Sequence, residues 1–468
     1  MRIIGRKAEI RELEKCEKSN KSELVCVFGR RRVGKTFLVE QTFSGYFTFR
    51  ATGIETGNTR MQLRAFHQRL KDYGDNTKQI PKNWFEAFSR LQHLLNSQKI
   101  QMSPHGKKIV FLDEFPWFAT PRSDFLPAFG EFWNRCGTIG GNYCFIICGS
   151  ATSWIINNVL KDSGSLYNRV TSQIFLSPFN LKEAEEFLSD RNFGWSRKQI
   201  AECHMVFGGL PYFLDLLNPD ESLSWNISNL CLNQHAILGH ESKKLLEATL
   251  KKSDIYGRIL EYLSEFCYGT GKKKCREHLN IPEGTFSRAV EELVECGYVQ
   301  EFKNRYSQGK ALQLRLTDPF LLFHYKFISK PVTDYKEDFG YYINWRGHAF
   351  EILCLSHIKQ IKAALGISGV STSEFSWTSE KKKDGAQIDL VIERDDGITN
   401  ICEAKFTDTP FSISGDYEKK LLNKIDVFRE ESKTKAALKL VMISSEGIAG
   451  TAHTENISRV LTLDDLFG

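Results

Sequence analysis

Residues 29–36 combine glycines, a lysine and a hydroxyl at a spacing that can hold phosphate groups. Their order, Gly-Arg-Arg-Arg-Val-Gly-Lys-Thr, fits the P-loop pattern G-x-x-x-x-G-K-[ST]. The glycines let backbone N–H groups point at a β-phosphate, Lys35 reaches the β- and γ-phosphates, and the Thr36 hydroxyl holds Mg²⁺. The sequence therefore predicts that ATP and Mg²⁺ bind to one loop, formed by Gly29, Arg30, Arg31, Arg32, Val33, Gly34, Lys35 and Thr36.

An apolar run at residues 108–112 ends in two carboxylates, Asp113 and Glu114. Such a run is typical of a central parallel strand, whose carboxyl end lies at the same sheet edge as a P-loop. There Asp113 can join Thr36 around the metal ion, and Glu114 can polarise the attacking water. Alone, the run would be an ordinary strand, but beside a P-loop it predicts hydrolysis of a nucleoside triphosphate with Asp113 and Glu114 as catalytic residues.

Three further residues are candidates for the nucleotide site. Ser150 ends the apolar run at residues 142–149 and can sense the γ-phosphate. Arg169 can supply positive charge to the transition state, in the same chain or to a neighbouring subunit, although an ordinary surface arginine explains it equally well. Pro211 stands in a Gly-Gly-Leu-Pro sequence that allows a close approach to nucleotide, although a structural turn accounts for the same residues.

A hairpin in the C-terminal part of the chain brings two acidic residues together. Residues 387–392 and 399–405 read as strands, and residues 395–397, Asp-Asp-Gly, suit a three-residue loop with glycine in the left-handed conformation. This loop pairs residues whose numbers sum to 792, so Asp389 faces Glu403 across the hairpin.

The hairpin register also places Lys405 on the face of Asp389 and Glu403. Facing carboxylates are unfavourable unless a cation lies between them. We therefore predict that Asp389 and Glu403 bind Mg²⁺, with Mn²⁺ as an alternative. Upstream, Glu351 is a candidate for a further ligand of this ion. An exposed hairpin whose charges are merely solvated is the alternative interpretation.

Size and composition limit the remaining possibilities. A chain of 468 residues suggests three or four modules. No apolar run approaches the about 20 residues needed to cross a bilayer, and the 12 cysteines include no C-x-x-C pair. We therefore expect a cytoplasmic protein with no membrane partner and no zinc or disulfide framework. The net charge of +6 permits a nucleic-acid partner without requiring one.

The order of these patterns predicts an α/β multidomain chain. We expect a P-loop ATPase core with a parallel sheet at residues 1–176, a helical lid at 177–245, a winged helix at 246–330 and a C-terminal α/β domain at 331–468. Basic residues of the winged helix, Lys272, Lys273, Lys274 and Arg288, can meet DNA phosphates. Three glutamates of its second helix, Glu291, Glu292 and Glu295, oppose a DNA backbone, so DNA binding and a protein-contacting role both stay open.

The first half of the chain resembles the archaeal-type, AAA+-related ATPases of the STAND group. The resemblance rests on five motifs in one order: residues 29–36, 113–114, 149–150, 166–169 and 208–211. In such ATPases the fourth motif usually reads Leu-Tyr-Gly-Arg, and this chain has Asn168 in place of the glycine.

The C-terminal part resembles the PD-(D/E)xK nuclease superfamily. The resemblance implies that Asp389 and Glu403 are metal ligands, that Lys405 orients or activates the attacking water, and that Glu351 is the acidic residue of the first helix. Together with residues 316–323, the whole arrangement resembles archaeal-type ATPases that carry a C-terminal domain of the DUF234 class.

These resemblances imply an ATP-hydrolysing protein whose nucleotide state controls a metal-dependent nuclease acting on DNA. The catalytic residues would be Asp113, Glu114, Arg169, Glu351, Asp389, Glu403 and Lys405. One alternative is a nucleotide-driven switch that assembles into a homo-oligomer or binds a protein partner, with an inert nuclease-like docking domain. Another is a DNA-binding regulator that uses the winged helix and senses ATP.

Overall fold

The computed structural model describes the chain from Arg2 to Gly468, apart from residues 98–99, 138–141, 162–165, 167, 242–252, 304–305, 307–311, 330–338 and 380–384. The described residues form two compact units, one up to Pro178 and one from Phe179 onward. The expected domain boundaries at 245/246 and 330/331 lie outside the described residues, as does Tyr167 of the fourth motif.

The first unit is built on a five-stranded sheet whose neighbouring strands are all parallel, in the order β2-β3-β4-β1-β5. Its strands are β1 Glu23–Phe28, β2 Phe47–Thr52, β3 Lys108–Asp113, β4 Tyr143–Gly149 and β5 Ser172–Phe175. Every residue of β1 and β4 is buried, because a parallel sheet has helices on both faces. The parallel sheet predicted for this part of the chain is confirmed.

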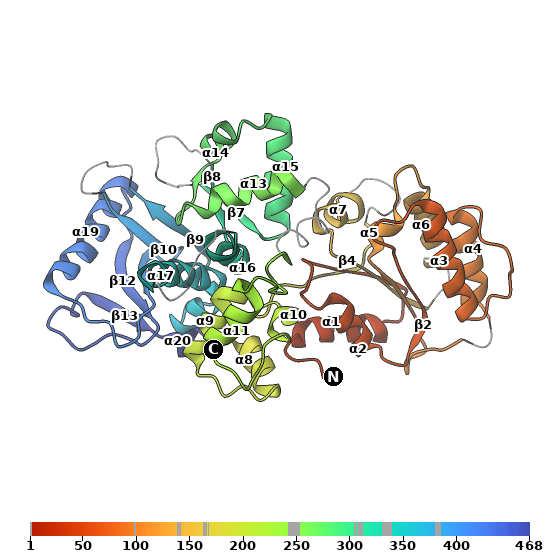
Figure 1. Ribbon diagram of the computed structural model, residues 1–468, viewed down its shortest axis with the longest axis horizontal. Coiled ribbons are helices and arrows are strands. Elements are labelled where there is room, and N and C mark those ends of the chain that lie inside the picture. Colours follow the sequence, from red (N-terminus) through yellow and green to blue (C-terminus); the bar gives the residue numbers. More distant parts are fainter. Residues whose placement is uncertain are drawn as a thin grey trace. The chain divides into compact units, whose positions relative to one another are not determined.

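Helices lie on both sides of this sheet (Figure 1). On one side, α1 Lys7–Lys18 and α2 Lys35–Thr42 contact its central strands. On the other, α3 Thr59–Asp72, α4 Trp84–Leu95 and α6 Phe125–Phe132 share one hydrophobic core with alternate residues of β1 and β4. Short segments complete the unit: α5 Phe115–Phe118, α7 Thr152–Ile155, and the π-helical turns η1 Trp133–Gly137 and η2 Ile156–Leu160.

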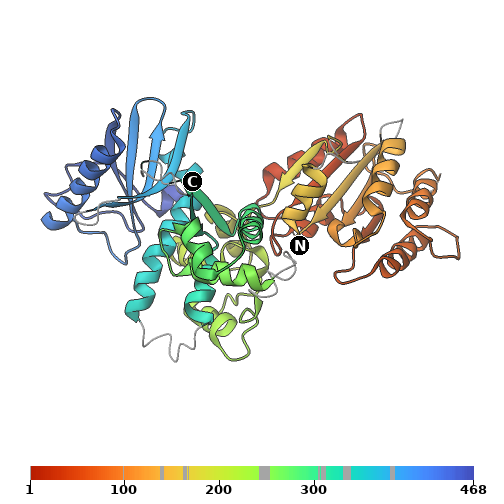
Figure 2. The same cartoon turned by 90° about the horizontal axis from the view of Figure 1, so that it is seen from above.

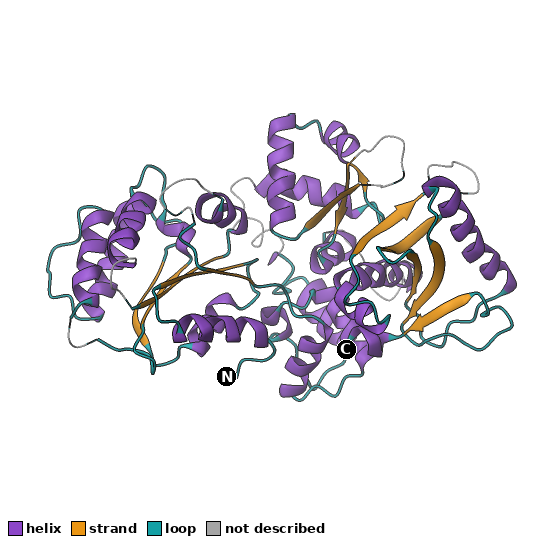
Figure 3. Ribbon diagram, turned by 180° about the vertical axis from the view of Figure 1, so that it is seen from behind, coloured by secondary structure: helices purple, strands orange, loops and turns teal. Residues whose placement is uncertain are grey.

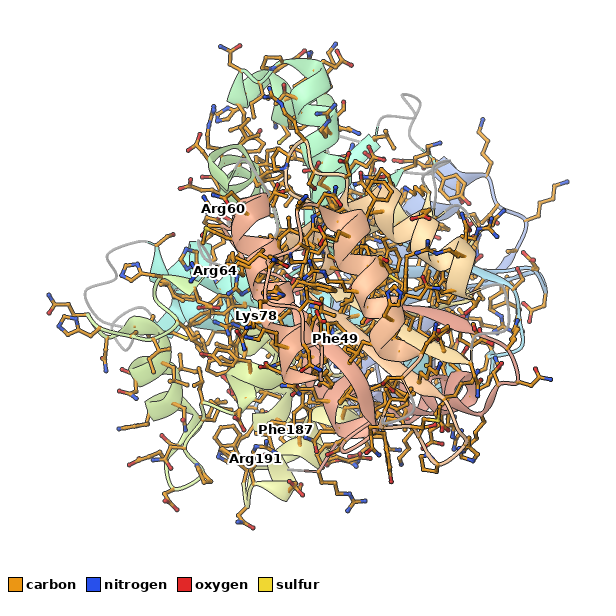
Figure 4. The ribbon with its side chains drawn as sticks, turned by 90° about the vertical axis from the view of Figure 1, so that its right-hand side faces the viewer. Phe49, Arg60, Arg64, Lys78, Phe187 and Arg191 are labelled. Carbon is orange, nitrogen blue, oxygen red and sulfur yellow. The ribbon has the colours of Figure 1, made fainter. Side chains whose placement is uncertain are left out.

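The packing of α3 follows from its amphipathic pattern. Leu63 and Phe66 are buried, and the ring centroids of Phe66 and Phe49 on β2 lie 5.3 Å apart. Arg60 and Arg64 stand one turn apart on the exposed face of the helix, whereas Phe49 is buried. Figure 4 labels all three residues.

The second unit begins with the helices predicted as a lid. These are α8 Leu181–Asp190, α9 Arg197–Phe207, α10 Pro211–Leu214, α11 Leu223–Ile227 and the π-helical turn η3 Ser228–Leu232. The capping box expected for α8, with Asn180 as N-cap and Glu183 three residues on, is confirmed. At the end of α8 the Arg191 guanidinium stacks on Phe187, 3.5 Å from its ring centroid (Figure 4).

Next come three helices and a small antiparallel sheet. The elements are α13 Ser253–Ser264, β6 Thr270–Gly271, α14 Lys272–Leu279, α15 Glu283–Glu295, β7 Val299–Lys303 and β8 Leu312–Leu316, with strand order β6-β8-β7. The helices and the hairpin lie where the sequence predicts them. Their assignment as a winged helix stays a prediction.

The rest of the second unit contains a mixed five-stranded sheet in the order β13-β12-β11-β10-β9, separate from the small sheet (Figure 3). Its strands are β9 Thr372–Thr378, β10 Gln387–Arg394, β11 Ile398–Lys405, β12 Ala437–Ser444 and β13 Ile457–Leu461. The helices are α16 Pro319–Phe323, η4 His324–Ile328 (a π-helical turn), α17 Phe339–Ser356, α18 Ile358–Ala364, α19 Gly415–Ser432 and α20 Leu463–Leu466. The long helix α19 flanks the sheet (Figure 2).

The β10–β11 hairpin has the predicted register. Leu390 pairs with Cys402 and Val391 with Ile401, so the residue numbers of each pair sum to 792. Gly397 in the turn has φ 82°, the left-handed conformation that the three-residue loop requires. The residues that face each other across this hairpin were therefore predictable from the loop length alone.

Candidate functional site

The P-loop joins the end of β1 to the start of α2, which is the strand–loop–helix context that its motif requires. Gly29 has φ 147°, and a Cβ at this position would lie 2.4 Å from the Leu176 carbonyl oxygen, so only glycine fits. Gly34, with φ 89°, is the N-cap of α2. The loop conformation thus depends on two of the motif residues for steric reasons.

The loop brings Lys35 and Thr36 next to Asp113 of β3. Lys35 is 6% exposed, and its Nζ donates to the carbonyl oxygens of Gly29 and Arg30, at 2.9 Å in each case. The Thr36 hydroxyl donates to Asp113 Oδ2 at 2.9 Å. Hydroxyl and carboxylate oxygens are the ligands that Mg²⁺ prefers, so this pair fits the metal predicted for the site.

The remaining loop residues have structural partners. Arg31 pairs with Glu55 at 3.3 Å, and the buried Val33 accepts a backbone hydrogen bond from Arg6 Nη2 at 3.3 Å. Arg32 has φ 74°, a conformation uncommon for residues other than glycine. Roles of the loop residues in nucleotide binding stay predictions.

Glu114 is held by Ser150. The Ser150 hydroxyl lies 3.0 and 2.9 Å from the two carboxylate oxygens, and its backbone N–H donates to Oε2 at 3.1 Å. Burial raises the pKa of Glu114, while the Lys35 ammonium and the Ser150 bonds oppose that rise. Glu114 also has φ 46°, an uncommon backbone conformation of the kind that clusters at functional sites. Ser150 therefore contacts the expected catalytic carboxylate, and its role as γ-phosphate sensor stays a prediction.

Two further predicted residues lie outside this contact network. Arg169 is exposed in a turn that follows Asn168. Asn168 has φ 53°, so asparagine here adopts the left-handed conformation that glycine takes easily. Pro211 belongs to the second unit and is the first residue of α10, as the sequence predicts for a helix start. Roles for Arg169 and Pro211 toward a nucleotide stay predictions.

In the second unit, Asp389 and Glu403 occupy the facing strands β10 and β11, as predicted. They are 6% and 4% exposed. Asp389 Oδ2 accepts a hydrogen bond from the backbone N–H of Ala404 at 2.8 Å. Lys405 lies on the same face, with its Nζ 2.8 Å from Glu403 Oε1.

Two residues that the sequence analysis did not single out also bind Glu403. The Tyr417 hydroxyl donates to Oε1 at 2.6 Å, and the Lys424 ammonium forms an ion pair with Oε2. Both belong to α19 and stand two turns apart on the face that also carries the buried Leu421 and Phe428. The sequence signal that could have identified Lys424 is a lysine on a helical face whose other residues are apolar.

Glu351, on α17, joins this cluster. The Tyr268 hydroxyl, from the segment between α13 and β6, lies 3.4 Å from Glu351 Oε1. Burial, with a contribution from the Glu403 charge, raises the pKa of Glu351 to about 7. The structure therefore brings together all four residues predicted for the second site, Glu351, Asp389, Glu403 and Lys405.

The two facing carboxylates have opposite electrostatic environments. Burial raises the pKa of Asp389 well above its ordinary value, and the Glu403 charge raises it further. Burial alone would also raise the pKa of Glu403, but the ammonium groups of Lys424 and Lys405 outweigh it and hold that pKa below its usual range. In this arrangement the ammonium groups of Lys405 and Lys424 offset the charge of Glu403.

Ser376 of β9 links the small antiparallel sheet to Asp389 on the neighbouring strand β10. Arg315 of β8 is 3% exposed and donates to the Ser376 hydroxyl at 2.8 Å, which in turn donates to the Asp389 carbonyl oxygen at 2.6 Å. Burial lowers the pKa of Arg315 to about 10. The buried Arg315 Nε has no hydrogen-bond partner within the part of the chain that the structure describes.

The donor set at the second site does not present a ready metal site. Among the described residues, no group of three or more His, Cys, Asp and Glu side chains is arranged to hold a metal ion. Both oxygens of Glu403 are engaged by protein donors. Metal binding by Asp389 and Glu403 stays a prediction.

Within the residues that the structure describes, no helix is both long enough and apolar enough to cross a bilayer.

Comparisons with known proteins cover the first unit and extend into the second. Residues 3–217 match the family model described as "ATPase domain predominantly from Archaea". A Methanocaldococcus jannaschii protein, MJECL04, is 21% identical over 359 residues, which cover 75% of each chain.

Three solved structures are also similar to this chain. The Walker-type ATPase paby2304 of Pyrococcus abyssi is 18% identical, with a TM-score of 0.49, over 69% of this chain and 96% of its own. The Aeropyrum pernix ORC2 protein is 15% identical, with a TM-score of 0.45, over 71% and 96%. A STAND protein of Pyrococcus horikoshii with a tetratricopeptide repeat sensor is 14% identical, with a TM-score of 0.32, over 78% of this chain and 50% of its own.

The motif geometry and the family match agree for the first part of the chain. The P-loop, the parallel sheet and the contact between Thr36 and Asp113 lie within the matched residues 3–217. The chain contains an archaeal-type ATPase domain of the P-loop class.

Proposed function

We propose that the first unit hydrolyses ATP. The observation that carries this proposal is the convergence of Lys35, Thr36 and Asp113 at the carboxyl ends of β1 and β3, with Glu114 next in sequence. The match of this region to an ATPase family supports the same function.

The positions of these residues suggest their roles. The Lys35 ammonium stabilises charge that develops on the β- and γ-phosphates, and Glu114 accepts the proton of the attacking water. The raised pKa of Glu114 suits a general base, since a base works best when its pKa approaches the operating pH. Mg²⁺ held by Thr36 and Asp113 would neutralise further phosphate charge. Ser150 orients the Glu114 carboxylate.

Steady-state ATP turnover tests the proposal. Replacing Glu114→Gln should lower turnover by about 100-fold or more while ATP still binds, and Lys35→Ala should weaken nucleotide binding itself. The control is Glu131→Gln, which changes an exposed glutamate of α6 that pairs with Arg135. Full turnover by the Glu114 and Lys35 variants would exclude this site from the reaction.

We propose, as a second candidate function, that the C-terminal domain cleaves phosphodiester bonds in DNA. The supporting observation is the convergence of Asp389, Glu403 and Lys405 on adjacent strands, with Glu351 near enough for its pKa to respond to Glu403. Lys405 would orient the attacking water. The predicted binding of Mg²⁺ or Mn²⁺ by Asp389 and Glu403 remains part of this proposal.

Cleavage of supercoiled plasmid and of single-stranded DNA with Mg²⁺ or Mn²⁺ tests this second function. Asp389→Asn should abolish cleavage. Asp395→Asn is the matched control, because Asp395 is an exposed aspartate at the tip of the same hairpin. Cleavage that persists in the Asp389 variant would assign the activity elsewhere.

We further propose that the nucleotide state of the first unit controls this second site. The Lys35→Ala variant, assayed for cleavage with and without ATP, tests the control. Absence of cleavage with either ion, together with nucleotide-dependent assembly, would favour the switch with an inert docking domain. Sequence-specific DNA binding that survives Asp389→Asn would favour a regulator. In the region of the predicted winged helix, Lys272 is already paired with Glu301 at 2.6 Å, which leaves less positive charge for phosphates.

A further inference from the structure

Lys424 occupies an unusual place for a lysine. Helix α19 places Tyr417, Leu421, Lys424 and Phe428 along one face, and Leu421 and Phe428 are 2% and 0% exposed. The Lys424 side chain is 19% exposed, in line with these buried residues. A charged group at such a position loses solvation, so it needs a compensating partner.

Its partner is Glu403, whose two oxygens are shared among three donors. Lys405 and Tyr417 both contact Oε1, at 2.8 and 2.6 Å, while the Lys424 ammonium contacts Oε2. A divalent cation that binds Glu403 Oε2 must therefore share that oxygen with the Lys424 ammonium or replace it there. Of the two ammonium groups, that of Lys424 contacts Oε2 and that of Lys405 contacts Oε1, so removing Lys424 takes a positive charge away from Oε2.

We propose that Lys424 is a tethered cation that occupies Glu403 when no divalent ion is bound and thereby sets the affinity of the site for such an ion. The inference rests on the second candidate function, because it takes Asp389 and Glu403 as cation ligands. Removing Lys424 eliminates both a competitor and a repelling charge, and both effects tighten metal binding.

The test measures Mn²⁺ binding rather than cleavage. The full-length chain is titrated with Mn²⁺ in the absence of nucleotide, and free Mn²⁺ is followed by electron paramagnetic resonance. Lys424→Met should bind Mn²⁺ about tenfold more tightly than the wild type, because a hydrogen bond between charged groups no longer has to be broken. Lys424→Arg keeps a competing cation and should bind as weakly as the wild type. The matched control is Lys420→Met, which changes an exposed lysine of the same helix.

Two additions make the result interpretable. Lys424→Gln should also bind Mn²⁺ more tightly than the wild type. It replaces the Met variant in the comparison if that variant folds poorly. Adding Asp389→Asn to Lys424→Met should remove the gain in Mn²⁺ affinity, which would show that the gain arises at this site. Unchanged or weaker Mn²⁺ binding by both neutral variants, or a wild type and variants that bind no Mn²⁺ at all, would overturn the inference. Tighter binding without any DNA cleavage would support the inference and refute the second candidate function.

Discussion

Neutralising the two facing carboxylates of the second site one at a time should have opposite effects on the stability of the β10–β11 hairpin. Glu403 is the charged member, because Lys405 and Lys424 hold its pKa below the usual range. Burial and the neighbouring charge disfavour an ionised Asp389. Without divalent ions, Glu403→Gln should therefore destabilise the hairpin, and Asp389→Asn should leave it unchanged or more stable.

The expected size follows from the ion pairs at Glu403. Breaking a buried ion pair by removing one partner costs about 3–5 kcal/mol. The Glu403 side chain is 6% exposed, but those of Lys405 and Lys424 are 28% and 19% exposed, so solvent recovers part of this cost. A loss of about 2–3 kcal/mol in the local free energy of unfolding is the expected result for Glu403→Gln. In Asp389→Asn the amide oxygen can still accept the Ala404 N–H bond.

Native-state hydrogen exchange measures this difference, because a multidomain chain does not unfold in two states. Peptides that cover residues 387–405 are followed in EDTA at pH 7.5. Exchange in Glu403→Gln should accelerate roughly 30- to 160-fold, the equivalent of 2–3 kcal/mol, while Asp389→Asn exchanges at the wild-type rate or more slowly. Equal acceleration in both variants, or slower exchange in Glu403→Gln, would refute the electrostatic reasoning.

Three other outcomes follow from the structure. Gly29→Ala should abolish ATP binding, measured by fluorescent-nucleotide titration, because a Cβ would lie 2.4 Å from the Leu176 carbonyl oxygen at φ 147°; retained affinity would contradict the steric argument. Ser150→Ala removes the side-chain hydrogen bond that lowers the pKa of Glu114, so the acidic limb of the ATPase pH profile should move to higher pH. An unmoved limb would show that Ser150 does not set the pKa of Glu114. Burial lowers the pKa of His357 from 6.5 to about 3, so the unfolded chain takes up the proton first and stability is lost as pH falls below 6.5. Between pH 7 and 5.5 the wild type should lose about 1 kcal/mol more local unfolding free energy around residue 357 than His357→Gln does, measured by native-state hydrogen exchange. Equal losses would contradict the lowered pKa of His357.

Local patterns in the sequence were sufficient to predict the P-loop, the strand that ends in Asp113 and the hairpin register. Each depends on short-range geometry. A loop of given length fixes which residues face each other, and glycines at positions 29 and 34 adopt backbone conformations that other residues rarely take. The grouping of Glu351 with the hairpin came from a family resemblance rather than from spacing, and the structure brings these residues together.

Only the tertiary structure decided which groups compensate the charges. Ser150 meets Glu114 because β3 and β4 are neighbours in the sheet, and Lys424 meets Glu403 because α19 packs its buried face on the strands. Because facing like charges require a cation, the sequence predicts Mg²⁺ or Mn²⁺ between the two carboxylates, but it gives no spacing that would place Lys424 beside them. Charges in a buried site act over distances set by packing rather than by sequence separation, so the pairing of Lys424 with Glu403 became evident only with α19 in place.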